Sequence, residues 1–413
     1  MIAKIHPSKL RGEVSAPPSK SHTHRALLAS AFAPGKSLIY NPLFCDDTRE
    51  TIRALEKLGA GFEIYPDRII VRGRKPERRD LLSLEIPASG STLRMLVPPL
   101  KGFVERLEIK TTPRMLERLA SPDLEQLAGL NISFRDGKVI LEGRLQGGSI
   151  SIEPVVTTQW LSGLIFALPF LPGSEIRTSY PLAGSYPALT LEVAQAFGIN
   201  FRFRNGSLRA ENHYLPAEYR VEGDYSAAAN WLVAGSFSSD LRVGGLNPAS
   251  QQPDSQLFAH LSAMGVPHKY ENGYFSCGAP KPLAAEIDVS RTPDLFPVLA
   301  ALASVRPGVT RISGLKKLKY KESDRAEMTA RGLGMLGADI KLLTEEAVIV
   351  GKEMLAGGVE IDAAGDHRLI MAFAILSGKI KEPFAIRSAE GVSKSYPDFF
   401  KTFLSLGGRV EFL

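Results

Sequence analysis

The sequence of 413 residues predicts an α/β fold made of six copies of one βαβαββ unit. A short apolar phrase ending in glycine closes a helix-like stretch six times, at Gly59, Gly129, Gly198, Gly265, Gly337 and Gly407, so successive glycines are 70, 69, 67, 72 and 70 residues apart. A second set of apolar helical stretches keeps the same spacing and begins near Ser21, Ser91, Thr158, Ser226, Asp294 and Asp366. Equal spacings indicate repeated units, so each copy should hold two helices.

The elements of one copy are clearest between residues 309 and 370. The apolar pattern predicts a helix between the first and second strands of this segment, and the next helix begins after its last strand. Each glycine follows a helix because the chain must take a left-handed conformation there, which glycine adopts at least cost. The predicted elements are strand 309–312, helix 321–336, and strands 338–343, 347–350 and 359–361.

Six copies exceed what one hydrophobic core usually serves, so they divide most simply into two domains of three. The expected seam is at residues 221–224. We expect one domain to be discontinuous, with residues 1–18 and 224–413, and the other to hold residues 19–223.

The composition, 44% hydrophobic and 23% charged, is that of an ordinary soluble globular protein. The longest apolar stretch, residues 160–171, is too short to span a bilayer, and the N-terminus lacks an apolar signal core, so we expect a cytoplasmic protein. Cys45 and Cys277 lie in different copies, and we expect neither a disulfide nor thiolate chemistry.

A net charge of +6 is weak evidence for nucleic acid, which usually needs a dense basic face. The positions of the cations are more informative, because a helix N-terminus is already partly positive and extra cations there favour a bound anion. The residues concerned are Lys20, Ser21 and Arg25 in the first helix, Arg114 before another, Lys321 and Arg325 in a third, His367 and Arg368 in a fourth, and Lys394 in the last.

The helix starts also differ between the two halves of the chain. The first half has Ser21, Gly90, Ser91, Thr157 and Thr158, and the second has Asp224, Asp294 and Asp366. Hydroxyls and free amides can grip phosphate, whereas carboxylates can cap helices or move protons.

These residues carry a resemblance to a known family. The chain resembles the 5-enolpyruvylshikimate-3-phosphate synthases, members of the enolpyruvyl transferases, along essentially its whole length. The matching motifs are PPSKSHTHR at 17–25, GSTLR at 90–94, PR at 113–114, TQ at 158–159, PD at 293–294, KESDR at 321–325, DHR at 366–368 and KSYP at 394–397.

The resemblance implies the two-domain enolpyruvyl transferase fold, with pseudo-threefold symmetry in each domain and helix N-termini aimed at a cleft. It implies transfer of the enolpyruvyl group of phosphoenolpyruvate to the 5-hydroxyl of shikimate 3-phosphate, with release of phosphate, in aromatic amino acid biosynthesis. We expect no cofactor and no metal, and a monomer that binds neither nucleic acid nor a membrane.

The resemblance also implies the site residues. Those for phosphoenolpyruvate are Lys20, Gly90, Arg114, Gln159, Arg325, Arg368 and Lys394. Those for shikimate 3-phosphate are Ser21, Arg25, Thr157, Thr158, Tyr186, Asp294 and Lys321. Asp294, Glu322 and Lys20 are the expected catalytic residues, with the two carboxylates handling protons.

Some positions depart from the usual family pattern. Ala88, Lys317 and Gly365 stand where the family commonly has Asn, and Met95 replaces a Pro. Gly90, the small residue beside the expected phosphoenolpyruvate site, is retained, which predicts sensitivity to the inhibitor glyphosate.

Two alternatives remain open. A transferase that uses UDP-N-acetylglucosamine usually carries a cysteine shortly before the position of Arg114, and residues 109–113 contain none. A protein of another class, one that binds RNA or processes RNA ends on similar repeats, is supported only by the basic runs at 72–79 and 316–321.

Overall fold

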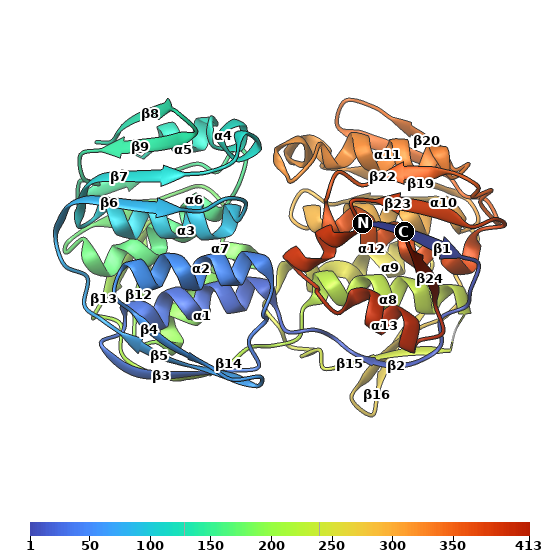
Figure 1. Cartoon of the computed structure of the whole chain (residues 1–413), viewed down its shortest axis with the longest axis horizontal. Coiled ribbons are helices and arrows are strands. Elements are labelled where there is room, and N and C mark those ends of the chain that lie inside the picture. The colour runs from blue at the N-terminus through green and yellow to red at the C-terminus, as the bar shows by residue number, and fades with distance from the viewer. Residues whose placement is uncertain (128, 239) are drawn as a thin grey trace. The chain divides into compact units, whose positions relative to one another are not determined.

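The structure is a computed structural model that describes residues 1–127, 129–238 and 240–413. The chain forms two compact units (Figure 1). Unit 1 contains Met1–Pro17 and Gly223–Leu413, and unit 2 contains Pro18–Glu222. The chain therefore starts in unit 1, passes once through unit 2 and returns.

Unit 2 contains three four-stranded sheets within the described residues, all with one topology: a parallel outer pair followed by two antiparallel neighbours. The strand orders are β14 (Glu218–Arg220), β3 (Gly35–Tyr40), β5 (Arg68–Gly73), β4 (Gly61–Ile64); β6 (Arg79–Glu85), β7 (Val104–Lys110), β9 (Lys138–Glu142), β8 (Asn131–Arg135); and β10 (Ser149–Ser151), β11 (Glu175–Arg177), β13 (Ser207–Glu211), β12 (Asn200–Arg204).

Unit 1 repeats this topology in its own three described sheets. The strand orders are β2 (Gly12–Ser15), β15 (Leu241–Gly244), β17 (Tyr274–Cys277), β16 (His268–Glu271); β18 (Ala285–Asp288), β19 (Val309–Ser313), β21 (Glu346–Val350), β20 (Asp339–Leu342); and β22 (Glu360–Asp362), β23 (Phe384–Arg387), β1 (Ile2–His6), β24 (Arg409–Phe412). The N-terminal strands β1 and β2 thus complete sheets whose other strands come from the C-terminal half.

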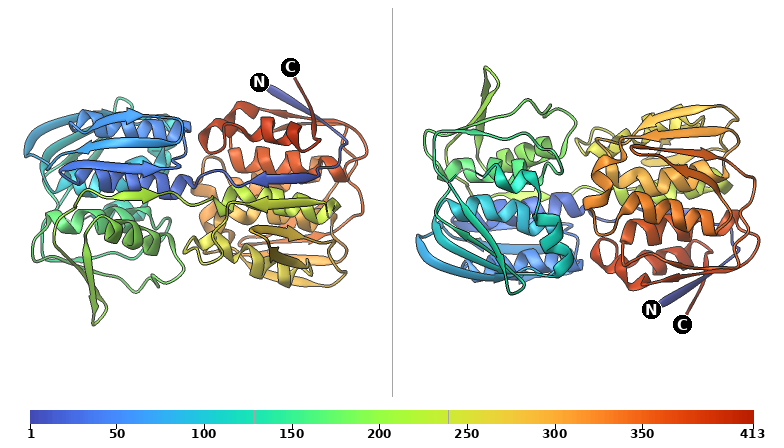
Figure 2. Two further views of the ribbon diagram at one scale, coloured as in Figure 1. Left: turned by 90° about the horizontal axis from the view of Figure 1, so that it is seen from below. Right: turned by 90° about the horizontal axis from the view of Figure 1, so that it is seen from above.

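Each copy supplies one inner helix to the core of its unit (Figure 2). In unit 2 these are α1 (Lys20–Phe32), α3 (Gly90–Lys101) and α6 (Gln159–Ala167), and in unit 1 they are α8 (Tyr225–Ser238), α10 (Phe296–Val305) and α12 (His367–Ala374). Neighbouring inner helices pack on one another, α3 on α6 and α10 on both α8 and α12. Because α8 and α10 are almost wholly buried, their sequences are apolar on all sides rather than amphipathic, whereas α1 begins with a run of polar residues, most of them buried.

The other helices lie outside this inner set and carry more exposed residues. They are α2 (Asp46–Lys57), α4 (Pro113–Leu119), α5 (Pro122–Glu125) and α7 (Tyr186–Ala196) in unit 2, and α9 (Leu257–Ala263), α11 (Arg325–Met335) and α13 (Phe399–Ser405) in unit 1. Short 3-10 helices also occur: η1 (Leu168–Phe170), η2 (Pro253–Gln256), η3 (Pro293–Leu295), η4 (Leu315–Tyr320), η5 (Ile375–Lys379) and η6 (Ala389–Lys394).

The α/β fold and its repeated glycines are confirmed. All six glycines that define the spacing have positive φ, between 72° at Gly265 and 96° at Gly59 and Gly337. A residue with a Cβ is strained in that conformation, so the end of each outer helix depends on glycine.

The predicted helix 321–336 was wrong at its start, since α11 begins at Arg325. The Asp324 side chain accepts a hydrogen bond from the backbone N–H of Glu327 and caps the helix there. Lys321 instead follows the 3-10 helix η4, and Lys394 ends η6 rather than opening a helix. The basic run 316–321 therefore lies in and just after η4 and not at the N-terminus of an α-helix.

Candidate active site

Unit 1 contains a largely buried cluster of charges around Asp294, a residue of η3 whose side chain is partly exposed. The Oδ1 atom of Asp294 lies 2.6 Å from Nη1 of Arg325 and 3.1 Å from Nζ of Lys321. Its Oδ2 atom lies 3.3 Å from Nη2 of Arg368. One carboxylate thus contacts three cations, which come from the end of η4, the start of α11 and the start of α12.

The cations around Asp294 set its state of ionisation. Burial alone would raise the pKa of Asp294, but Lys321, Arg368 and Arg325 together hold the pKa well below its ordinary value. Asp294 is therefore an anion at neutral pH in the absence of a ligand. An anion bound to the same cations would weaken their hold on the carboxylate and make it a better base.

Arg325 joins Asp294 to two further carboxylates. Its Nη2 atom lies 2.6 Å from Oε2 of Glu322, and its Nε atom lies 2.9 Å from Oδ2 of Asp366. The guanidinium group is only 1% exposed, so its contacts with the carboxylates are desolvated. Lys321, Arg325 and Arg368 balance Asp294, Glu322 and Asp366 in formal charge, so a bound anion must compete with these internal carboxylates.

Two of the aspartates at helix starts in unit 1 are helix caps. Asp366 accepts a hydrogen bond from the backbone N–H of Arg368, and Asp224 accepts one from Ala227. Each bond satisfies an otherwise unpaired amide in the first turn. Asp366 combines its cap with the contact to Arg325, whereas Asp294 contacts three cations.

Lys394 lies at the end of η6 and takes no part in these ion pairs within the described part of the chain. Lys317 lies within η4, and His367 is the first residue of α12.

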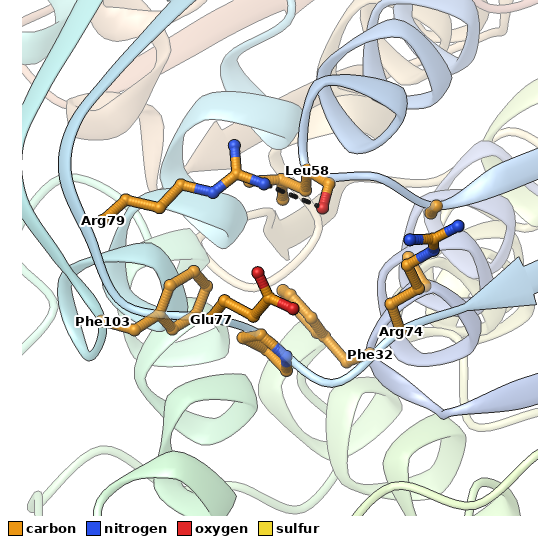
Figure 3. Close-up of a pocket in the computed structure, with 9 residues that line it drawn as sticks. Phe32, Leu58, Arg74, Glu77, Arg79 and Phe103 are labelled. Atoms are coloured by element: carbon orange, nitrogen blue, oxygen red, sulfur yellow. Dashed lines mark hydrogen bonds between the residues drawn. The ribbon is translucent and has the colours of Figure 1, made fainter.

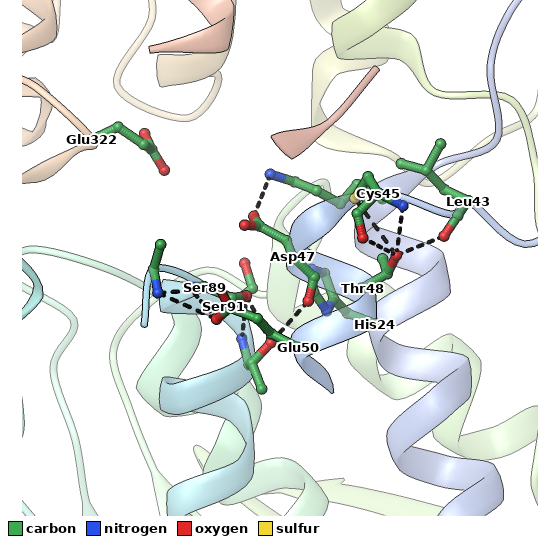
Figure 4. Close-up of polar contacts among 12 residues, drawn as sticks. His24, Leu43, Cys45, Asp47, Thr48, Glu50, Ser89, Ser91 and Glu322 are labelled. Carbon is green, nitrogen blue, oxygen red and sulfur yellow. Dashed lines mark hydrogen bonds and ion pairs between the residues drawn. The ribbon is translucent and has the colours of Figure 1, made fainter. Parts of the chain in front are cut away.

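In unit 2, Lys20 is the first residue of α1 and is mostly buried. Its Nζ atom lies 2.9 Å from Oδ2 of Asp47, the second residue of α2 (Figure 4). Asp47 therefore holds the ammonium group of Lys20 at the N-terminal end of the two helices.

A chain of buried hydroxyls follows the same helix starts (Figure 4). Nδ1 of His24 lies 2.7 Å from Oγ1 of Thr51, which lies 2.6 Å from Oγ1 of Thr92, and that hydroxyl bonds to Ser89. Burial, with the charges of Lys20 and Arg25, keeps the pKa of His24 well below its usual value, so the imidazole is neutral. The chain ties α1, α2 and α3 together beside Lys20.

Arg25 is buried, and other protein groups already accept its hydrogen bonds. Its Nε donates to Oγ1 of Thr190 at 2.9 Å, and its Nη1 to the carbonyl of Ser21 at 2.9 Å. Its Nη2 donates to the carbonyl of Tyr186 at 3.1 Å and to Oγ of Ser162 at 3.5 Å. Arg25 thus fixes the starts of α1 and α7.

Gln159, the first residue of α6, bridges two elements of unit 2. Its Nε2 donates to Oγ of Ser91 at 2.9 Å, and its Oε1 accepts from Nη1 of Arg94 at 3.0 Å. Arg94 also donates to the carbonyl of Arg118 at 3.0 Å. A Cβ built on Gly90 would lie 3.0 Å from guanidinium atoms of both arginines, so the space at Gly90 is tightly limited.

The remaining predicted residues of unit 2 lie at helix starts. Thr158 is the N-cap of α6, and Oγ1 of Thr157 accepts the backbone N–H of Gln159. Arg114 is the second residue of α4 and pairs with Glu117 at 3.0 Å. Tyr186 begins α7.

Three acidic residues of unit 2 that the sequence reasoning missed hold these helix starts. Besides Asp47, Glu50 accepts the backbone N–H groups of Ala88 and Ser89, just before α3. Asp123 accepts those of Val155, Val156 and Thr157, just before α6, at 2.7–3.1 Å. Their common signal is an acidic residue in the first turns of the second helix of a copy.

A small pocket in unit 2 lies apart from these residues (Figure 3). It is lined by Phe32, Phe103, Leu58, Arg74, Glu77 and Arg79 among others. Arg79 donates to the carbonyls of Lys57 and Leu58 at 3.2 and 3.3 Å, and so satisfies the C-terminus of α2. The pocket contains none of the predicted site residues.

Known structures place the fold among the enolpyruvyl transferases. The enolpyruvyl transferase NikO from Streptomyces tendae matches with a TM-score of 0.80 at 17% identity, covering 99% of this chain and 98% of that one. EPSP synthase from Acinetobacter baumannii matches with a TM-score of 0.75 at 22% identity, over 100% of both chains. The two-domain enolpyruvyl transferase fold expected from the sequence is confirmed.

Sequence relatives define the family more closely. The sequence profile described as EPSP synthase (3-phosphoshikimate 1-carboxyvinyltransferase) matches residues 5–403. Proteins named 3-phosphoshikimate 1-carboxyvinyltransferase are similar over nearly their whole length: that of Clostridium kluyveri is 35% identical, covering 98% of this chain and 97% of the relative, and that of Clostridium novyi is 33% identical, covering 99% and 98%. The chain belongs to the EPSP synthase family.

Among the described residues, none of the helices combines the length and the apolar character that a membrane span requires.

Proposed function

We propose that this chain transfers the enolpyruvyl group of phosphoenolpyruvate to the 5-hydroxyl of shikimate 3-phosphate and releases phosphate. The observation that carries the proposal is Asp294 in contact with Lys321, Arg325 and Arg368, with Glu322 on the same arginine. Such a cluster offers cations to an anionic substrate and carboxylates to move protons. Membership of the EPSP synthase family supports the choice of substrates.

The roles of individual residues form part of the proposal. In unit 1, Arg325, Arg368 and Lys394 hold phosphoenolpyruvate, while Lys321 and Asp294 hold shikimate 3-phosphate. In unit 2, Lys20, Gly90, Arg114 and Gln159 serve phosphoenolpyruvate, while Ser21, Thr157, Thr158 and Tyr186 serve shikimate 3-phosphate. Arg25 also serves shikimate 3-phosphate, and it holds Ser21 and Tyr186 in place for that ligand through its hydrogen bonds to their carbonyls.

The reaction requires the protein to accept protons from the substrates and also to donate protons to them. The acceptor hydroxyl attacks C2 of phosphoenolpyruvate and gives its proton to a base, for which we assign Asp294, while an acid, Glu322, adds a proton to the methylene carbon and makes it a methyl group. The bond from C2 to the phosphate oxygen then breaks, and a methyl proton returns to the protein as the double bond forms again. Lys20 supplies positive charge or a proton to the leaving phosphate.

Further parts of the proposal concern the setting of the enzyme. We infer a cytoplasmic monomer that acts on small anions without nucleic acid, a membrane or a cofactor. Glyphosate sensitivity is expected because Gly90 leaves the space beside Arg94 and Arg118 open.

Release of phosphate from phosphoenolpyruvate tests the function. The purified protein is given phosphoenolpyruvate with shikimate 3-phosphate, or with UDP-N-acetylglucosamine as the rival acceptor. Release with shikimate 3-phosphate alone is expected. Release only with UDP-N-acetylglucosamine would transfer the assignment to the other acceptor, and silence with both would overturn the transferase proposal.

A further inference from the structure

The stretch at residues 153–157 leads from β10 towards α6 and ends at Thr157, one of the two threonines that we assign to shikimate 3-phosphate. It belongs to neither a helix nor a strand. One side chain, that of Asp123, accepts hydrogen bonds from three of its consecutive backbone N–H groups. The shape of this stretch therefore depends on a residue 32 to 34 positions earlier in the chain.

Asp123 uses both carboxylate oxygens in these bonds. Its Oδ1 atom accepts the N–H of Val155 at 2.7 Å and that of Val156 at 3.1 Å. Its Oδ2 atom accepts the N–H of Val156 at 3.0 Å and that of Thr157 at 2.7 Å. The residue is 0% exposed, and a buried carboxylate is stable only when such donors replace its water. Asp123 and the stretch before α6 therefore hold each other in place.

Gln126 fixes the other end of the same stretch. It lies three residues after Asp123, at the end of α5, so the two side chains lie on one face of that helix. Its Oε1 atom accepts the N–H of Glu153 at 2.8 Å, and its Nε2 atom donates to the carbonyl of Glu153 at 3.1 Å. The two side chains thus supply the hydrogen-bond partners that a helix or a strand would otherwise supply.

The same arrangement occurs one copy earlier in unit 2. Glu50 of α2 accepts the N–H groups of Ala88 and Ser89, just before α3 (Figure 4). In both cases an acidic residue in the outer helix of one copy binds the amides that precede the inner helix of the next copy. Because both inner helices begin with residues that we assign to the substrates, each acid sets the position of groups in the neighbouring copy.

The carboxylate of Asp123 also decides which groups at this helix start are left for a ligand. Consecutive N–H groups before a helix attract anions, but those of residues 155–157 are already bonded to a carboxylate. Thr157 and Thr158 are only partly buried. Oγ1 of Thr157 accepts the N–H of Gln159, so its O–H group can donate to an oxyanion. A phosphate at this helix start would therefore be bound through hydroxyl groups.

We propose that Asp123 is a positioning residue for shikimate 3-phosphate. By binding the amides of residues 155–157, it fixes the backbone from which the hydroxyls of Thr157 and Thr158 meet the phosphate group of that ligand. Gln126 supports the same backbone from its other end. The identity of the ligand rests on the proposed function.

The proposal predicts a difference between the two substrates. Gln159, which we assign to phosphoenolpyruvate, is also held by Ser91 and Arg94, so its position depends less on Asp123 than that of Thr157 does. Loss of the Asp123 bonds should therefore weaken the binding of shikimate 3-phosphate more than that of phosphoenolpyruvate. A merely structural role would lower stability without this difference between the substrates.

Asp123→Asn tests the proposal. Asparagine has the size of aspartate, but its amide nitrogen would face backbone N–H groups, so donor would oppose donor on that side. The dissociation constant for shikimate 3-phosphate is measured by calorimetry, and KM for both substrates and kcat are measured by steady-state kinetics. Glu125→Gln, at an exposed acid of the same helix, makes the same change of charge and is the matched control.

We expect the dissociation constant and the KM for shikimate 3-phosphate to rise at least about tenfold in Asp123→Asn, because charge-assisted bonds to the loop are lost. The KM for phosphoenolpyruvate and kcat should change less than about threefold, and Glu125→Gln should follow the wild type. Amide hydrogen exchange, followed by mass spectrometry, should become faster at residues 155–157. Unchanged affinity for shikimate 3-phosphate in a folded Asp123→Asn would overturn the proposal, and so would equal increases in the two KM values.

Gln126→Ala provides a second variant if Asp123→Asn does not fold. It removes both bonds to Glu153 and leaves Asp123 in place, so the KM for shikimate 3-phosphate should rise by a smaller factor, about threefold, and more than that for phosphoenolpyruvate. A KM for shikimate 3-phosphate equal to that of the wild type would contradict the proposal.

Calorimetry separates this inference from the proposed function, because binding of shikimate 3-phosphate alone needs no turnover. Binding that depends on Asp123, without release of phosphate from phosphoenolpyruvate, would remove the proposed function and leave the inference standing. Normal release of phosphate, with the same affinity for shikimate 3-phosphate in Asp123→Asn and the wild type, would remove the inference and leave the function standing.

Discussion

At the scale of single residues, Arg325 holds the unit 1 cluster together. Its guanidinium group reaches Asp294, Glu322 and Asp366 from one buried position. Only a planar fork with several fixed donors can serve three carboxylates at once, and lysine cannot reproduce it. The orientation of Asp294 thus depends on the residue that also neutralises it.

Arg325→Lys should therefore impair both folding and activity. We expect the free energy of unfolding to fall by about 3 kcal/mol, because buried carboxylates lose their partner, and kcat/KM for phosphoenolpyruvate to fall at least about a hundredfold. Urea unfolding and steady-state kinetics measure the two effects. Arg311→Lys, at an exposed pair with Glu346, should change stability by less than about 1 kcal/mol, and an equally small change in Arg325→Lys would refute the argument.

Asp294→Asn tests the base. The amide keeps the shape of the side chain but cannot accept a proton, so turnover should slow by at least about a hundredfold while KM for both substrates changes little. Kinetics with the exposed Asp339→Asn as control measure the difference. Unchanged turnover would remove Asp294 from the mechanism.

The sequence pointed to Asp294, Glu322 and Arg325 because they occur in short motifs whose residues are close in the chain. It did not point to Asp123 or Glu50, which accept backbone N–H groups more than 30 residues away. Such contacts depend on how neighbouring copies pack, and an isolated acidic residue in a helix carries no mark of its distant partner.

At the scale of elements, helix α3 is fixed at both ends by buried charged side chains. Glu50 binds the amides just before it, and Lys101, its last residue, donates to three carbonyls, those of Val104, Glu105 and Leu141, at 2.7–3.1 Å. A cation at a helix C-terminus also interacts favourably with the helix dipole. Both ends of the helix that carries Gly90 and Ser91 are thus held rigidly.

Lys101→Met should lower the free energy of unfolding by on the order of 3 kcal/mol, because three carbonyl oxygens lose a buried donor. Lys57→Met, at the exposed last residue of α2, is the matched control and should have little effect. Chemical denaturation measures both. A loss in Lys101→Met no larger than in the control would show that water replaces the ammonium group.

The same lysine predicts a pH dependence. Burial lowers the pKa of Lys101 to about 8, against 10.5 for the unperturbed group. Between these pH values the unfolded chain binds more protons, so the wild type should gain stability relative to Lys101→Met as pH rises from 8 towards 10.5. If the difference in the free energy of unfolding between the wild type and Lys101→Met does not change with pH, this prediction is wrong.

Gly90→Ala tests the start of the same helix. The added methyl group would press on the guanidinium groups of Arg94 and Arg118, and Arg94 holds Gln159. We expect KM for phosphoenolpyruvate to rise by several-fold to about tenfold, with kcat less affected, because ground-state binding is disturbed. Gly334→Ala in α11, where a Cβ meets open space, is the control and should behave as the wild type. Equal KM values in Gly90→Ala and Gly334→Ala would show that Arg94 and Arg118 can move aside without any effect on binding.

Most element types and helix ends could be predicted from the sequence, because apolar periodicity and the six glycines are local signals. The start of α11 was not, since η4 interrupts a run that has helical composition, and the cap at Asp324 decides where the helix begins. Sequence patterns place such boundaries poorly when two helical segments adjoin.

At the scale of the whole molecule, six copies of one topology form two compact units through which the chain passes in the order 1, 2, 1. The N-terminal strands β1 and β2 are built into sheets of unit 1, so its two chain segments fold together. The sequence indicated the repeat, but which strand completes which sheet follows from long-range pairing that has no local signal. Each unit places its own set of cations and acids at the starts of its helices.

The central claim is enolpyruvyl transfer by addition and elimination, and the product formed in D₂O tests it most directly. The protein is incubated with phosphoenolpyruvate and shikimate 3-phosphate, and the product is followed by proton NMR. The account predicts vinyl signals of an enolpyruvyl ether on the shikimate ring, weakened by deuterium, because the methylene carbon becomes a methyl group and then loses one hydrogen. An ether free of deuterium would contradict the addition and elimination steps, and unchanged phosphoenolpyruvate would contradict the activity itself.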